Sequence, residues 1–168
     1  MVNSIKVLTL AGLFMALVII LSAFSIPVPG GHLYFNDIVI CLAALLFKPR
    51  EALLIAGVGA FLGDYFFYPT PMFVSLVTHG LQAFIIASLL KVCHGQDSHW
   101  KVALILLVGA VIMVTGYTLG RAFVYASPLV AMTKLPFQIL QALFGIVVSY
   151  IIYFYTGLRK AFIKSISF

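Results

Sequence analysis

The stretch Gly57–Pro71, GVGAFLGDYFFYPTP, has three glycines followed by an aspartate and a group of aromatic residues and prolines. The spacing Gly57-x-Gly59-x-x-x-Gly63 differs by one residue from that of dinucleotide-binding folds, and these glycines end an apolar segment instead of opening a helix after a strand. The chain also has no G-x-x-x-x-G-K-[ST] phosphate-binding loop. Small residues at such intervals in an apolar helix let helices approach closely. We therefore interpret the glycines as packing residues.

The composition indicates which solvent surrounds this stretch. Of the 168 residues, 64% are hydrophobic and only 8% are charged, and the mean hydropathy is +1.20. Soluble domains contain roughly a quarter of charged residues, so this chain has too few polar side chains to cover its own surface. We predict an all-α integral membrane protein in the cytoplasmic membrane of a prokaryote.

Apolar runs of helical length recur along the chain with short connections between them. A helix needs about 20 residues to cross the hydrocarbon core of a bilayer. The second run is too short to cross alone, and we expect less regular chain around residues 33–36 to extend it under a cover of protein. We predict a single membrane domain, residues 1–168, that forms a six-helix bundle. The expected helices span about residues 5–26, 36–48, 52–68, 72–90, 102–126 and 135–157.

The basic residues predict the orientation of the bundle. If the N-terminus is cytoplasmic, eight of the ten lysines and arginines face the cytoplasm, and only Arg121 and Lys134 face outward. The excess of positive charge on one side predicts that both termini are inside. The net charge of +6 then reflects topology and lipid head groups and indicates no binding of nucleic acid.

Two aspartates lie in or beside these apolar runs. A carboxylate there costs several kcal/mol unless it is paired, hydrated or protonated. Counted from the turn at residues 47–51, Asp37 and Asp64 fall at similar depth near the outer ends of two antiparallel helices. Either the two acids share one polar site, or each faces water at the end of its helix.

Other polar residues collect on the same outer side. His79 and Gln82 are three residues apart and share a helix face, and the outer loops add aromatic residues that belong to an interfacial belt or stack on a flat ring. Aromatic side chains with a few placed polar groups are typical of small-molecule sites. The candidate substrate-binding residues are His32, Tyr34, Asn36, Asp37, Asp64, Tyr68, His79, Gln82, Tyr117, Arg121, Gln138 and Gln141.

The first predicted helix carries the small residues Gly12-x-x-x-Ala16, with Ala11 and Met15 beside them. Such spacing presents a flat face to another transmembrane helix, in this chain or in a partner. The two cysteines, Cys41 and Cys93, fall on different predicted helices without the spacing of metal ligands, so we expect no metal site.

The block at residues 31–90, GHLYFNDIVICLAALLFKPREALLIAGVGAFLGDYFFYPTPMFVSLVTHGLQAFIIASLL, resembles the substrate-binding (S) component of energy-coupling factor (ECF) vitamin transporters. The similar features are an L-x-x-x-D start, a hydrophobic helix that ends in L-L-F-x-P, and a glycine-rich helix that ends in an acid. Where relatives often have Lys-Gly-Leu-Glu, this chain has His79-Gly80-Leu81-Gln82, which leaves the charge of the ligand open.

The resemblance implies a six-helix bundle that binds a vitamin or its precursor at the outer side. It also implies docking through Gly12 and Ala16 onto a membrane coupling protein that carries two ATPases. ATP would then be used by those partners, and this chain would bind no cofactor and have no enzymatic activity of its own. The resemblance is closest to the hydroxymethylpyrimidine or pyridoxine subgroup, whereas pantothenate, an anion, would need Arg121 or Lys134 for its carboxylate.

Two other classes of protein compete with this interpretation. An intramembrane hydrolase could use Asp37 and Asp64 to activate water, but no motif of such enzymes is present. A stand-alone secondary transporter or channel could move protons along Asp64, His79 and Arg121. Internal repeats would favour a transporter of that kind, and residues 1–90 and 91–168 show none.

Overall fold

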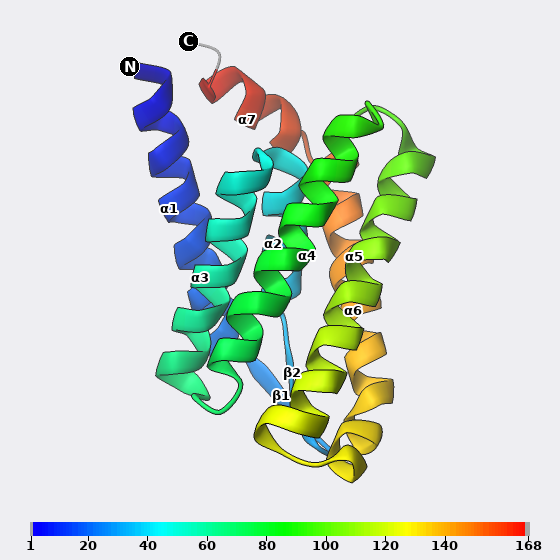
Figure 1. Ribbon diagram of the computed structural model, residues 1–168. Helices are drawn as coiled ribbons and strands as arrows, with labels where there is room; N and C mark the ends of the chain where they lie inside the picture. The colour runs from blue at the N-terminus through cyan, green and yellow to red at the C-terminus, as the bar shows by residue number, and fades with distance from the viewer. Residues whose placement is uncertain (1, 167–168) are drawn as a thin grey trace.

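The computed structural model describes residues 2–166 and consists of helices with one short β-hairpin (Figure 1). The π-helical turn η1 continues α5 without a break. The all-α fold class is confirmed. In chain order the elements are α1 (Val2–Ala23), β1 (Ser25–Val28), β2 (Gly31–Tyr34), α2 (Asn36–Leu46), α3 (Pro49–Phe67), α4 (Met72–Val92), α5 (His99–Gly120), η1 (Arg121–Tyr125), α6 (Pro128–Tyr155) and α7 (Leu158–Ile166).

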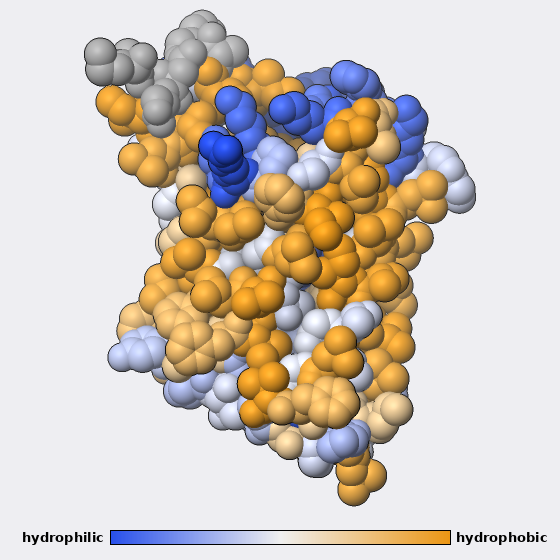
Figure 2. Space-filling model, viewed as in Figure 1, coloured by the Kyte–Doolittle hydropathy of each residue, from blue (hydrophilic) through white to orange (hydrophobic). Residues whose placement is uncertain are grey.

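Within residues 2–166, four segments are each long and apolar enough to cross a membrane: Ile5–Ala23, Met72–Val92, His99–Tyr125 and Pro128–Tyr155. Hydrophobic side chains cover the flank of the molecule, and strongly hydrophilic ones gather at the end where α7 lies (Figure 2). A bilayer matches this pattern, since lipid would contact the flank and water the ends. The chain is an integral membrane protein, while six crossings and the orientation stay predictions.

The short helix α2 lies at the centre of the bundle, in contact with α1, α3, α4 and α6. Nine of its eleven residues are buried. Because protein surrounds α2, it needs neither the length nor the apolar surface of a helix that contacts lipid. The expected short second helix is therefore confirmed, and its neighbours explain why it can be short.

The irregular chain that we expected before α2 is an antiparallel hairpin of β1 and β2, in which Val28 pairs with Gly31. Its turn is Pro29–Gly30, and Gly30 has φ +80°, a conformation that glycine adopts readily. A Cβ on Gly30 would lie 3.0 Å from Lys134 Cβ, so the hairpin packs closely on α6. The hairpin covers the end of the bundle that lies away from α7 (Figure 1).

The glycines of the opening stretch are helix-packing residues, as predicted. A Cβ on Gly57 would lie 2.9 Å from the carbonyl oxygen of Leu76 in α4. Built on Gly59 and Gly63, it would meet side chains of α1, at 3.0 Å from Val18 and 2.4 Å from Ser22. Glycine therefore allows α3 to contact α4 on one side and α1 on the other.

The start of α6 and the presence of α7 differ from expectation. α6 begins at Pro128, well before residue 135, because Ser127 caps it by accepting a hydrogen bond from Val130 N at 3.4 Å and Pro128 fits the first turn. Pro136 lies inside this helix instead of marking its start. The amphipathic helix α7 was also not expected, because its polar face hides it from a search for apolar runs.

The substitution Gly57→Ala should lower the stability of the protein. The added methyl group would meet the backbone of α4, and overpacking of this kind typically costs about 1–3 kcal/mol. Thermal unfolding of the detergent-solubilised protein should show a lower midpoint for this variant. Gly12→Ala is the matched control, since a Cβ there meets nothing within 4 Å. Equal midpoints for the two variants would contradict the close contact between α3 and α4.

Candidate functional site

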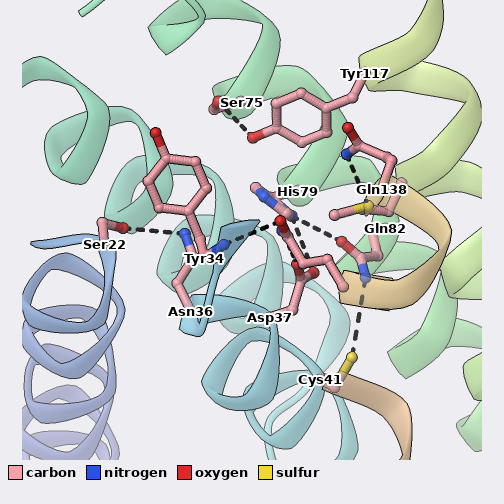
Figure 3. A network of polar contacts seen from close by, with 12 residues as sticks. Ser22, Tyr34, Asn36, Asp37, Cys41, Ser75, His79, Gln82, Tyr117 and Gln138 are labelled. Atoms are coloured by element: carbon pink, nitrogen blue, oxygen red, sulfur yellow. Dashed lines mark hydrogen bonds and ion pairs between the residues drawn. The ribbon is translucent and has the colours of Figure 1, made fainter. Parts of the chain in front are cut away.

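A cluster of buried polar side chains lies at the hairpin end of the bundle, beneath β1 and β2 (Figure 3). Its members come from the hairpin, α2, α3, α4, α5, η1 and α6, and Ser22 of α1 accepts a hydrogen bond from one of them, so every element around the bundle except α7 contributes a polar group. Polar groups at such depth are stable only with hydrogen-bonding partners. The buried members are Asn36, Asp37, Asp64, Ser75, His79, Gln82, Arg121, Lys134, Gln138 and Gln141.

Asp37 is at the centre of the cluster. Its Oδ2 accepts a hydrogen bond from Gln141 Nε2 at 2.6 Å, and its Oδ1 lies 3.9 Å from His79 Nδ1. Gln141 Oε1 in turn accepts the backbone N–H of Tyr34 at 3.0 Å. The hairpin, α2, α4 and α6 are thus connected through one carboxylate. Asp37 Oδ1 has no hydrogen-bond partner although it is buried, which leaves an acceptor for a bound molecule.

Asp64 is connected to the same cluster through α4 and α5. Ser75 donates a hydrogen bond to Asp64 Oδ2, and the Tyr117 hydroxyl donates one to Ser75 Oγ at 2.5 Å. The ring of Tyr117 packs edge-on against His79 at a centroid distance of 5.2 Å. The two aspartates therefore belong to one cluster, the first of the two alternatives that the sequence left open, although Ser75, Tyr117 and His79 separate them.

His79 and Gln82 project from the same face of α4, as their spacing predicts. His79 Nδ1 lies 2.8 Å from Gln82 Oε1, so the amide oxygen accepts the ring N–H of the histidine. Gln82 Nε2 lies 3.9 Å from the thiol of Cys41 in α2. The other ring nitrogen of His79 is then free to accept a hydrogen bond.

The hairpin and the start of α2 bring three more of the predicted residues to the cluster. His32 packs edge-on against Tyr68 at 5.3 Å, and Asn36 Nδ2 donates to Ser22 Oγ at 3.0 Å. Burial raises the pKa of the Tyr34 phenol well above its usual range, so this hydroxyl stays protonated. His32 Nδ1, the Tyr34 hydroxyl and Asn36 Oδ1 are buried without a hydrogen-bond partner.

Arg121 and Gln138 complete the cluster on the side of η1 and α6. Arg121 Nη1 donates to Gln138 Oε1 at 3.3 Å, and its guanidinium lies 5.6 Å from the centre of the Tyr125 ring. Gln138 Nε2 lies 3.3 Å from the sulfur of Met113. All twelve predicted substrate-binding residues thus lie at this end of the bundle, and whether each contacts a ligand stays a prediction.

Part of the aromatic stretch does not face the cluster. Tyr65, Phe66, Phe67 and Phe73 are all more than half exposed on the outside of the bundle, where they pack against neighbouring rings. This placement fits a belt at the membrane interface and excludes these four rings from stacking on a molecule held inside. Among residues 2–166, no three His, Cys, Asp or Glu side chains are arranged to hold a metal ion.

The four predicted docking residues of α1 divide into two pairs. Gly12 and Ala16 are exposed on the outward face of the helix, whereas Ala11 and Met15 are partly buried and pack against the core. The window of α1 that could span a membrane is only 17% buried within the bundle. A small-residue face of α1 is therefore available to a partner, although no partner is present.

The sequence analysis missed Ser75 and placed Lys134 in a loop. Ser75 comes one turn before His79 on the same face of α4, a spacing that would have identified it. Lys134 lies one turn before Gln138 in α6 and is only 1% exposed. It lay outside the expected helix of residues 135–157 because a lysine does not extend an apolar run.

The sequence of the chain is also similar to a known protein family. Residues 2–160 match the model of the family described as ECF-type riboflavin transporter, S component. The match covers nearly the whole chain and includes every element that contributes to the polar cluster. The chain belongs to this family. As an S component it is part of a transporter and not an enzyme, and the resemblance seen in the sequence is confirmed.

Two relatives show how far the similarity of this S component extends. It is 34% identical over 125 residues, 73% of this chain and 82% of the relative, to a protein of Pyrococcus woesei described as an uncharacterized protein in gap 3'region. It is also 34% identical over 123 residues, 70% of this chain and 72% of the relative, to the thiamine precursor transporter HmpT of Lactococcus lactis subsp. cremoris (strain MG1363).

The substitution Ser75→Ala should destabilise the S component. Without the serine, Asp64 loses its hydrogen-bond donor and Tyr117 its acceptor, and each buried group left unpaired costs about 1–3 kcal/mol. The midpoint of thermal unfolding should fall clearly. Ser88→Ala, on the same helix but with a partly exposed side chain, is the control and should unfold like the original protein. A midpoint unchanged by Ser75→Ala would show that Asp64 does not depend on this contact.

Proposed function

We propose that this S component binds a small heteroaromatic vitamin or vitamin precursor, of the hydroxymethylpyrimidine or pyridoxine class, in the polar cluster beneath the hairpin. The observation that carries the proposal is the set of buried polar atoms without hydrogen-bond partners. Burying such atoms is unfavourable unless a bound ligand supplies the missing hydrogen bonds. Three of these atoms, on Asp37, Tyr34 and Asn36, lie at the same end of the bundle as the hydrogen-bonded network.

The side chains of the cluster suit a flat ring that carries polar substituents. Asp37 Oδ1 is an acceptor for an amino or hydroxyl group, and the amides of Gln82 and Gln138 both donate and accept. Tyr117 and His79 offer aromatic edges and faces for packing on a ring. The family description names riboflavin and the relative's name a thiamine precursor, and both ligands contain a nitrogen heterocycle.

The proposed orientation places the hairpin end outside the cell. Eight of the ten basic side chains then lie at the cytoplasmic ends of the helices, in accord with the positive-inside rule. All six helices α1–α6 cross the cytoplasmic membrane of a prokaryote, with α2 inside a sheath of protein. The ligand enters beneath the hairpin and leaves toward the cytoplasm.

Energy for uptake comes from partner subunits in this proposal. The S component docks through Gly12 and Ala16 of α1 onto a transmembrane coupling protein that carries two ATPases, and it binds no cofactor itself. The competing function is a secondary transporter in which protons move along Asp64, His79 and Arg121. Such a transporter would keep working in cells that lack the ATPases, whereas uptake by this S component should stop there.

A binding experiment tests the proposed ligand class. Titration calorimetry of the purified protein with hydroxymethylpyrimidine, pyridoxine, riboflavin and pantothenate should give tight binding of a pyrimidine or pyridine. Asp37→Asn should weaken that binding about 10–100-fold, because hydrogen bonds to a charged group contribute about 1.5–3 kcal/mol. The matched control is Asp97→Asn, since Asp97 is exposed at the other end and pairs with Arg159 at 2.7 Å. Tight binding of pantothenate alone would contradict the ring hypothesis.

A second experiment tests the docking face. Gly12→Leu should prevent assembly with the coupling protein and the ATPases, because a large side chain separates helices that pack through small residues. Ligand binding should be unchanged, since the space beside Gly12 is open and far from the polar cluster. Co-purification measures assembly, with Thr115→Leu on the exposed side of α5 as control. Loss of ligand binding in Gly12→Leu, or normal assembly, would contradict the assignment.

A further inference from the structure

Two buried cations at the hairpin end have no acidic partner. Arg121 is 7% exposed and Lys134 is 1% exposed. The chain has four acidic residues, all within the described part, and none forms an ion pair with either cation. The other contacts of the acids explain this. Asp37 accepts a hydrogen bond from Gln141, and Asp64 accepts one from Ser75. Asp97 pairs with Arg159, and Glu51 lies in the first turn of α3 at the opposite end of the bundle.

The two cations face one small space beside the hairpin. A Cβ built on Gly31 would lie 3.7 Å from Arg121 Nη2 and 3.9 Å from Lys134 Cε, which are ordinary contact distances. The space is therefore wide enough for at least one further atom, and both side chains border it. Lys134 Nζ donates to the carbonyl oxygen of His32 at 2.5 Å, which uses one of its three donors.

Neutral partners do not compensate two like charges at this depth. Arg121 has a glutamine oxygen and the Tyr125 ring, and Lys134 has one backbone carbonyl. Taking a charge out of water costs several kcal/mol unless an opposite charge is near, and two cations close together repel each other as well. A bound anion would relieve both costs at once. The hydroxyl of Tyr125 and His32 Nδ1 are also buried without partners beside these residues.

We propose that Arg121 and Lys134 form an anion subsite, so that the ligand is a heteroaromatic molecule that carries a phosphate or carboxylate group. The inference rests on the proposed function, because the ring occupies the polar cluster around Asp37. Arg121 connects the two parts: Nη1 holds Gln138 in the cluster while Nη2 faces Gly31. A guanidinium suits both anions because its donors match two oxygens at once.

The competing role for Lys134 is structural, since its bond to His32 attaches the hairpin to α6. A purely structural lysine would affect every ligand equally, because a loose hairpin exposes the whole cluster. An anion subsite affects only ligands that carry the charge. Comparison of charged and neutral forms of one ring therefore separates the two roles.

The test compares affinities for matched pairs: hydroxymethylpyrimidine and its phosphate monoester, and pyridoxine, its phosphate and pyridoxic acid. In the original protein the anionic form should bind at least about tenfold more tightly than the neutral parent, as charge-assisted hydrogen bonds predict. Lys134→Gln and Arg121→Gln should each weaken binding of the anionic form by a clearly larger factor than binding of the neutral parent, so that most of this preference is lost. The matched control is Lys101→Gln, since Lys101 Nζ bonds the carbonyl of Cys93 at 2.9 Å at the opposite end.

The affinities for charged and neutral rings distinguish failure of the anion subsite from failure of the proposed ring site. Equal affinity for charged and neutral rings, or equal weakening of both in the variants, overturns the anion subsite and leaves the ring site intact. Binding of pantothenate alone, lost in Lys134→Gln, supports the subsite and overturns the ring. If a glutamine variant fails to fold, Lys134→Arg keeps the charge and should retain the preference; its loss there would also overturn the inference. The relative affinities of the unsubstituted protein for the phosphate and the carboxylate of one ring identify which anion the subsite binds.

Discussion

The fold of the hairpin end depends on how a carboxylate can be kept inside an apolar bundle. Asp37 is 1% exposed, and an isolated buried charge of this kind is not stable. Its compensation comes from Gln141 of α6 and His79 of α4. A Cβ on Gly145 would lie 2.7 Å from Asp37 Cβ, so α6 must also contact α2 directly at this residue. The same contacts that satisfy the charge therefore fix the relative positions of α2, α4 and α6, and through Gln141 they also fix the hairpin.

Helix α4 separates two kinds of interaction. Gly80 contacts Gly57 on the side of α3, where backbones approach closely and no polar group is needed. His79 and Gln82 face the other side, toward α2 and α5, where hydrogen bonds replace close packing. α3 and α4 are thus joined mainly by small residues on one side of α4, and α2, α4 and α5 by polar ones on the other. Ser22 of α1 and Asp64 of α3 also bond to members of the polar cluster.

The sequence predicted the helices α1–α6, with the second one short, and the gathering of the polar residues at one end of the bundle, because apolar runs are unambiguous at 64% hydrophobic content and the few polar residues within them stand out. The features that it did not reveal depend on context. β1 and β2 are too short to show a periodic pattern, and their pairing depends on the turn at Gly30 and on the surface of α6. Lys134 lay outside the expected helix because the apolar run begins after it, whereas Ser127 and Pro128 start α6 before it and Pro136 is accommodated within the helix.

In the protein without a ligand, the buried cations of the polar cluster lack a partner of opposite charge. Each buried acid has protein donors, whereas the buried cations have only neutral acceptors. A protein selected only for stability would place an acid beside Lys134 or replace it with an apolar residue, since a buried charge without an ion partner is unfavourable. The unpartnered groups include acceptors on Asp37 and Asn36 as well as the cations, so a molecule that satisfies them must donate hydrogen bonds at one end and carry negative charge at the other. Both requirements meet at Arg121, whose Nη1 bonds Gln138 and whose Nη2 faces Gly31, so we expect this residue, and not either aspartate, to determine how the two ends of a ligand are arranged.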